Sequence, residues 1–197
     1  MRADGKTGEN MENYFEYIKK TYYENLFDIT NLEENIHVIF YSVLAFFLPF
    51  VLGHPQILVG IIVNTYLILG ATYLKGYKLL PVILLPSIGV LTAGVLFGSY
   101  TVFLVYMIPF IWIGNAIFAY GHRLLHFRTK KYYLSMPVSA ILKTAFLFGS
   151  AYALVGLHII PATFLTTMGL FQLYTALIGG VAAYGIILAR AKFAHSA

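Results

Sequence analysis

The sequence contains no aspartate and no glutamate after Glu34. All eight acidic residues lie in the first 34 positions, and the rest of the 197-residue chain carries nine charges, all of them lysine or arginine. A soluble domain of this size needs a surface of which roughly a quarter to a third is charged, with both signs mixed. The missing acids therefore indicate long segments that face lipid, and they exclude carboxylate chemistry from those segments.

Cysteine is absent from the whole chain. This excludes disulfides, a thiolate nucleophile and any cysteine-ligated metal or iron–sulfur cluster. The zinc-protease helix motif, phosphate-binding loops, the nucleophile elbow and dinucleotide glycine patterns are missing as well. A Ser–His–acid triad cannot form in the apolar part of the chain, because the acid is missing. We therefore expect no enzyme activity, no cofactor and no resident metal.

The residues that are present are mostly apolar, at 59% against 11% charged. Average soluble domains have about 45–50% apolar and about 25% charged residues. Six runs have about the length needed to cross a bilayer, and they predict an all-α polytopic membrane protein with six transmembrane helices. The runs are 36–53, 57–74, 79–97, 101–120, 136–157 and 161–189. The third contains Pro81 and Pro86, so both a continuous helix and a kinked or partly re-entrant one are compatible with it.

Basic residues occur in every other predicted loop. They lie at 75–78, in the long loop 121–135 and in the tail 190–197, whereas the three remaining loops have none. The positive-inside rule then predicts that both termini lie in the cytoplasm. We expect a multi-pass protein of a prokaryotic cell membrane, with a cytoplasmic acidic segment at 1–35, a transmembrane domain at 36–189 and a basic tail.

The acidic segment has a pattern of its own. Apolar residues recur every three or four positions from Met11 to Ile29, which predicts an amphipathic helix lying on the membrane interface. It could dock a cytoplasmic partner or simply cover the underside of the bundle. The sequence Thr30-Asn31-Leu32-Glu33 is a capping box and predicts the start of the first span.

Three charged or titratable residues need separate interpretation. Lys143 is the one charged residue that falls well inside a predicted span, and we expect its ammonium to reach the cytoplasmic headgroups. Contact with a partner or an anionic group is the alternative. His122 and His126 are spaced i, i+4, but they stand among lysines and arginines, so we expect a solvated loop and no metal site.

Uncharged polar residues are the remaining candidates for a site. An unpaired amide in hydrocarbon costs several kcal/mol, so Asn64, Asn115 and Gln172 should face the interior of the bundle. There they could join helices together or line a mostly apolar pocket, open to the outside, with a few orienting polar groups. The candidate ligand-binding residues are Gln56, Asn64, Tyr106, Trp112, Asn115, His158, Gln172 and Tyr174.

Several stretches carry a family resemblance. They are PQILVGIIVN (55–64), PSIG (86–89), PFIWIGN (109–115) and TMGLFQ (167–172). These stretches resemble a group of small bacterial and archaeal membrane proteins, sometimes labelled "iron hydrogenase", an activity that the absence of cysteine argues against. The group is near the substrate-binding S components of energy-coupling factor (ECF) transporters, which the predicted six-span layout with both termini inside also resembles. The resemblance covers roughly residues 36–189.

The resemblance implies that the chain captures a vitamin or another micronutrient outside the cell. A membrane T component and two cytoplasmic ATPases would be its partners. S components commonly contact the T component through an Ala-x-x-x-Ala pattern on span 1, where this chain has only Ser42 and Ala45. Docking by another face and no docking are both compatible with that departure. The alternative function is a non-transport structural or accessory subunit of a larger membrane complex.

Overall fold

The computed structural model describes residues 29–52, 55–94 and 98–194, and these are almost entirely helical. The elements are α2 (Asn31–Leu52), α3 (Gln56–Tyr73), η1 (Gly76–Leu79), α4 (Leu80–Ala93), η2 (Gly98–Tyr100), α5 (Thr101–Thr129), α6 (Tyr132–Gly156), α7 (Thr163–Thr166), η3 (Thr167–Phe171) and α8 (Gln172–Ala194). Among these described residues, six helical segments are long and apolar enough to cross a membrane. The all-α prediction with six such segments is confirmed. The predicted amphipathic helix before Ile29 lies outside the described residues.

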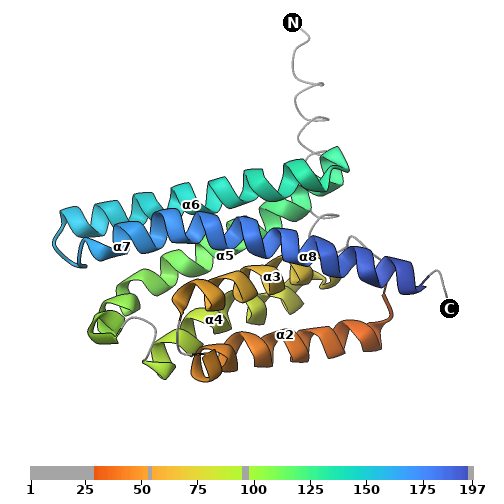
Figure 1. Ribbon diagram of the computed structural model, residues 1–197, viewed down its shortest axis with the longest axis horizontal. Helices are drawn as coiled ribbons and strands as arrows, with labels where there is room; N and C mark the ends of the chain where they lie inside the picture. Colours follow the sequence, from red (N-terminus) through yellow and green to blue (C-terminus); the bar gives the residue numbers. More distant parts are fainter. Residues whose placement is uncertain (1–28, 53–54, 95–97, 195–197) are drawn as a thin grey trace, which may run out of the picture.

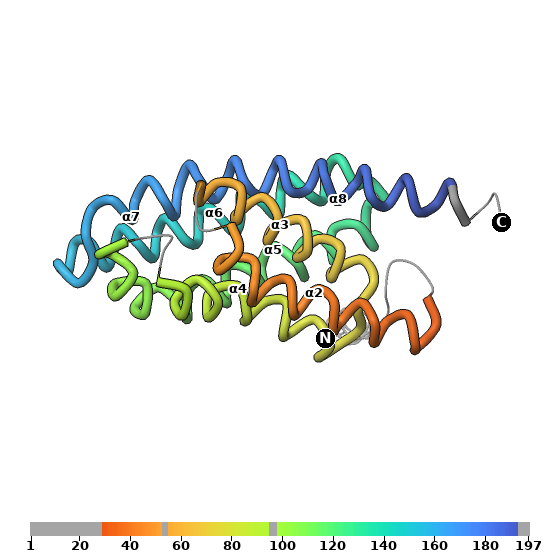
Figure 2. Tube along the Cα trace, turned by 60° about the horizontal axis from the view of Figure 1, so that its bottom comes forward, coloured from red at the N-terminus to blue at the C-terminus, as the bar shows by residue number. Residues whose placement is uncertain are grey.

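The helices run side by side along the long axis of the molecule (Figure 1). α5 packs on α6, α3 on α8 and α2 on α4. α3 is central, because it also contacts α2, α4 and α5. Figure 2 shows α3 lying between α8 on one side and α2 and α4 on the other. Residues on α3 can therefore reach most of the bundle, which matters for the site described below.

The two ends of the bundle differ in charge. One end, here called the basic end, holds the start of α2, the α3–α4 and α5–α6 connections and the end of α8 (Figure 1). The opposite end, the neutral end, holds the end of α2, the start of α3, the end of α4, the start of α5 and the α6–α7 connection. The sequence between these helices contains no lysine or arginine. The alternation of basic and neutral loops along the sequence thus becomes a segregation of charge in space.

The predicted capping box forms at the start of α2. The Thr30 backbone N–H donates to Glu33 Oε2 at 2.9 Å, and the Glu33 N–H donates to Thr30 Oγ1 at 3.2 Å. The next residue, Glu34, is buried and accepts from the Lys75 N–H at 2.6 Å and from Lys78 Nζ at 2.7 Å. Glu34, the last acid of the sequence, therefore joins α2 to the α3–α4 connection.

The prediction of a long basic loop at 121–135 is wrong. α5 continues to Thr129, only Lys130 and Lys131 lie between the helices, and α6 begins at Tyr132. Lysine and arginine are good helix formers, so a basic composition does not by itself end a helix. The break occurs at Lys130, whose backbone takes the left-handed conformation (φ 57°).

Extension of α5 places Arg123 in the interior, where it is fully buried. Its guanidinium donates to the carbonyl of Ala71 at 2.7 Å, and also to the carbonyls of Gly70 and Leu74. These carbonyls lie at the C-terminal end of α3, where the helix dipole attracts a positive charge. Arg123 therefore fastens the end of α3 to α5.

Glycines set the closest helix contacts. A Cβ added to Gly89 of α4 would lie under 3.0 Å from the Phe46 carbonyl of α2, and one on Gly179 of α8 would lie 2.6 Å from the Ile61 carbonyl of α3. Small residues at these points allow helix backbones to approach. By contrast, a Cβ on Gly149 or Gly185 would meet no atom within 4 Å among the residues that the structure describes.

Candidate ligand-binding site

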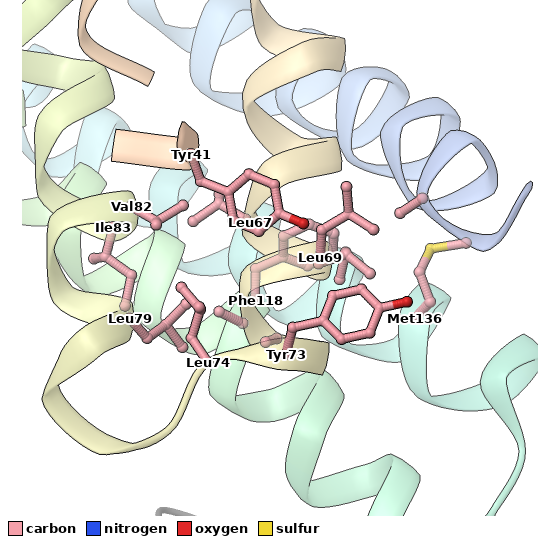
Figure 3. Packing of buried hydrophobic residues seen from close by; sticks show 14 of the residues in the cluster. Tyr41, Leu67, Leu69, Tyr73, Leu74, Leu79, Val82, Ile83, Phe118 and Met136 are labelled. Carbon is pink, nitrogen blue, oxygen red and sulfur yellow. The ribbon is translucent and has the colours of Figure 1, made fainter. Parts of the chain in front are cut away.

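Two apolar cores fill the bundle, and a polar layer separates them. The core toward the basic end includes Leu67, Leu74, Leu79 and Phe118, which pack together in Figure 3. The core toward the neutral end includes Leu104, Leu147 and Phe164. Along α4, α5, α6 and α8, the residues between the two cores include Ser87, Asn115, Lys143 and Thr175, and Asn64 joins them from α3. All five of these polar residues are buried.

Lys143 is the central residue of this layer, with only 2% of its surface exposed. Its Nζ donates to Asn64 Oδ1 at 2.7 Å and lies 5.3 Å from the centroid of the Phe118 ring. An amide oxygen and an aromatic face both favour a cation, but both are neutral. Within the described part of the chain, no carboxylate contacts this ammonium.

Our expectation that Lys143 reaches the headgroups is therefore wrong. α6 begins at Tyr132, four residues earlier than the sequence suggested. At 1.5 Å per residue, Lys143 lies about 17 Å along the helix from that start, near the middle of the span. Its side chain points toward α3 and not along the lipid-facing surface.

Asn64 is held in one orientation by its neighbours. Its Nδ2 donates to the Gly60 carbonyl at 2.9 Å and to Thr175 Oγ1 at 3.1 Å, while Thr175 Oγ1 itself donates to the Phe171 carbonyl at 2.7 Å. The reversed amide would direct its N–H groups at the Lys143 ammonium and its oxygen at a carbonyl. The network therefore presents Oδ1 to Lys143 and links α3, α6 and α8.

A second polar group lies where Pro86 interrupts the hydrogen-bond ladder of α4. Asn115 Nδ2 donates to the Ile83 carbonyl at 3.1 Å. The Trp112 indole N–H donates to Ser87 Oγ at 2.8 Å and to the Leu84 carbonyl at 3.1 Å. These bonds fasten α5 to the turn of α4 that contains Pro86, and α4 stays helical through the proline. The third span is thus a continuous helix from Gly76 to Ala93.

These groups surround a cavity of about 90 Å³. Its polar lining comes from Gln56, Asn64, Ser87, Asn115, Lys143 and Gln172. Apolar side chains form the rest of the wall, among them Val59, Val63, Val90, Leu104, Ile111 and Met168. Gln56 and Gln172 are half-buried, and their side chains have no hydrogen-bond partner among the described residues. A mostly apolar cavity with a few convergent polar groups is typical of a small-molecule site.

The backbone is irregular beside the cavity. Thr167–Phe171 forms a π-helical turn, η3, between α7 and α8. Such turns are rare and occur often at functional sites, because they displace side chains from the regular helical positions. Here the turn directly precedes Gln172, and Met168 within it lines the cavity.

The structure brings together half of the eight candidate ligand-binding residues. Gln56, Asn64, Asn115 and Gln172 line the cavity, and Trp112 adjoins it through its hydrogen bond to Ser87. The other three lie elsewhere: Tyr106 and Tyr174 are 53% and 56% exposed on the outside of the bundle, and His158 is exposed in the α6–α7 connection. Lys143 and Ser87 also line the cavity but were not among the candidates.

The histidine pair is not in a solvated loop. His122 is fully buried on α5, 5.8 Å from the ring of His126, and Tyr132 packs edge-on against it. Within residues 29–52, 55–94 and 98–194, no group of three or more His, Cys, Asp or Glu side chains is placed to hold a metal ion.

No family model, curated protein or solved structure matches the chain. Any functional assignment therefore depends on the geometry of the site. The polar layer presents one buried cation and several amides to the cavity.

Proposed function

We propose that this chain is the substrate-capturing membrane subunit of an ECF-type micronutrient or vitamin uptake transporter. It spans the cell membrane of a prokaryote, with its termini and basic end in the cytoplasm and its neutral end outside. The observation that carries the proposal is the cavity, on which Gln56, Asn64, Asn115 and Gln172 converge with Lys143. Three of the stretches that resemble the group of small membrane proteins near the S components, 55–64, 109–115 and 167–172, contribute these four residues.

The neutral end is the expected entrance. Gln56 is the first residue of α3 and belongs to that end, whereas Asn64 and Lys143 lie deeper, at the polar layer. A solute arriving from outside would meet the Gln56 and Gln172 amides before it reached Lys143.

Transport by such a subunit needs an energy source from partners, because the sequence contains no phosphate-binding loop. The expected partners are a T component and two cytoplasmic ATPases. α2 offers a surface for the T component: it lies at the edge of the bundle and exposes Ile39, Phe40 and Phe47. Such a contact would not require the Ala-x-x-x-Ala pattern.

A structural or accessory subunit is the second candidate, and the cavity volume favours it. Small-molecule pockets commonly begin at about 300 Å³, and this cavity has about 90 Å³. The glycine faces at Gly149 and Gly185, where a Cβ would meet no described atom within 4 Å, could also receive a helix of another protein. Under the transport proposal, the small volume implies either a small solute or an opening movement at the neutral end.

Native mass spectrometry of the full chain, gently extracted from its own host, separates the two functions. Co-purification of a T component, two ATPases and a bound small molecule is the result expected for an uptake subunit. Stable association with other membrane proteins, with neither ATPases nor any small molecule, would contradict the transport role and support the accessory one.

A further inference from the structure

We propose that the cavity binds a short-chain monocarboxylate, with the Lys143 ammonium holding the carboxylate group. This inference rests on the proposed solute-binding role and names the chemical class of the solute. It begins with the charge of the polar layer, which contains a lysine and no acid.

Within residues 29–52, 55–94 and 98–194, no carboxylate neutralises the charge of Lys143. A charged side chain at the centre of a membrane is costly, and such residues usually pair with an opposite charge. The chain has no acid after Glu34, and the two acids at the start of α2 are joined to other cations, Glu33 to Arg190 and Glu34 to Lys78. Among the described residues, no acid is therefore left to pair with Lys143, which favours a counter-charge supplied by a bound molecule.

Donor groups remain for that molecule. A lysine ammonium has three N–H donors, and in the described structure one of them is used, by Asn64 Oδ1. The amides of Gln56 and Gln172 line the same cavity and supply further N–H groups. An anion held by an ammonium and by neutral donors in a site of low polarity gains strong, charge-assisted hydrogen bonds.

Size and wall chemistry favour a short carboxylate over other anions. At about 90 Å³ the cavity is small, which favours a solute of only a few heavy atoms. Side chains such as Val63, Leu104 and Met168 form an apolar wall opposite the donors. A short alkyl group would fill that space, whereas a halide would leave the wall without a partner.

The test uses propionate and the purified full-length protein in detergent, with propionamide as the uncharged ligand of matched shape. Sodium gluconate, a carboxylate too bulky for the cavity, keeps the ionic strength constant. Two readouts are measured: the thermal unfolding temperature, which rises with ligand occupancy, and the emission of Trp112. Trp112 is the one tryptophan of the chain and donates to Ser87, which lines the cavity.

We expect a saturable rise in unfolding temperature and a saturable change in Trp112 emission with propionate, and neither with propionamide. Lys143→Met should weaken propionate binding by about tenfold or more, because a desolvated charge pair is lost. Lys131→Met, the same substitution at an exposed position before α6, should bind as the wild type does. The Trp112 titration needs no variant, so it tests the proposal even if Lys143→Met does not fold.

Three results would overturn the carboxylate site: equal responses to propionate and propionamide, no response to either, or unchanged binding by a folded Lys143→Met variant. The transport role is tested separately from the carboxylate site. A neutral solute found by native mass spectrometry, with no response to propionate, would overturn the anionic ligand and leave solute capture standing. A propionate response in a protein that recruits no ATPases would support the site and contradict the ECF role.

Discussion

Replacing Asn64 by alanine should destabilise the bundle more than any other single amide substitution in the polar layer. The change removes the acceptor of the Lys143 ammonium and the donor to Thr175 Oγ1. A hydrogen bond to a charged group contributes about 1.5–3 kcal/mol, and a neutral interhelical bond in a membrane protein contributes about 0.6 kcal/mol. We therefore expect a loss of about 2–4 kcal/mol in the free energy of unfolding.

Asn115→Ala is the matched control. Asn115 is equally buried but makes one neutral hydrogen bond, to the Ile83 carbonyl. Its removal should cost about 1 kcal/mol. The measurement is unfolding by sodium dodecyl sulfate in mild detergent, followed by far-ultraviolet circular dichroism, for the wild type and both variants.

A double variant decides whether the cost arises from the buried charge. In Asn64→Ala with Lys143→Met, the cation that lost its acceptor is also gone, so part of the stability should return. The reasoning is refuted if Asn64→Ala costs no more than Asn115→Ala, or if the effects of the two substitutions simply add.

Two further predictions concern packing and the end of α3. Gly89→Ala should cost at least about 1–3 kcal/mol, since its Cβ would collide with the Phe46 carbonyl. Gly149→Ala should change the melting temperature little, because its Cβ meets no described atom within 4 Å. Similar melting temperatures for both variants would contradict the close α2–α4 contact. Arg123→Met should lower the free energy of unfolding by at least about 2 kcal/mol, since C-terminal carbonyls of α3 lose their donor. Arg128→Met, at an exposed position on the same helix, should stay within about 0.5 kcal/mol of the wild type in the same assay. An equal effect of both arginine variants would refute the role of Arg123 in capping α3.

Hydropathy and local chemistry along the chain predict much of the fold. The six apolar segments follow from length and composition, and the capping box at Thr30–Glu33 follows from four adjacent residues. The inward direction of Asn64 and Asn115 follows from the cost of an unpaired amide in lipid. Each of these inferences depends on one residue or on its near neighbours, so no knowledge of the other helices is required.

Helix ends in basic segments were not predictable in the same way. The sequence between 121 and 135 is polar enough for a loop, yet it is helical except at Lys130 and Lys131. The reason is tertiary: Arg123 finds acceptors at the end of α3, and His122 packs against Tyr132. Neither contact leaves a local signal in the sequence.

The sequence by itself determines that no acid follows Glu34, so no carboxylate within the apolar segments can accompany Lys143. Only the tertiary structure decides that Lys143 is buried at all. α6 is apolar on most of its circumference, so its composition does not specify which face meets α3. The start predicted for this helix was also four residues too late. The contacts of Asn64 and Phe118 orient the lysine inward, and the packing of six helices leaves the cavity beside it.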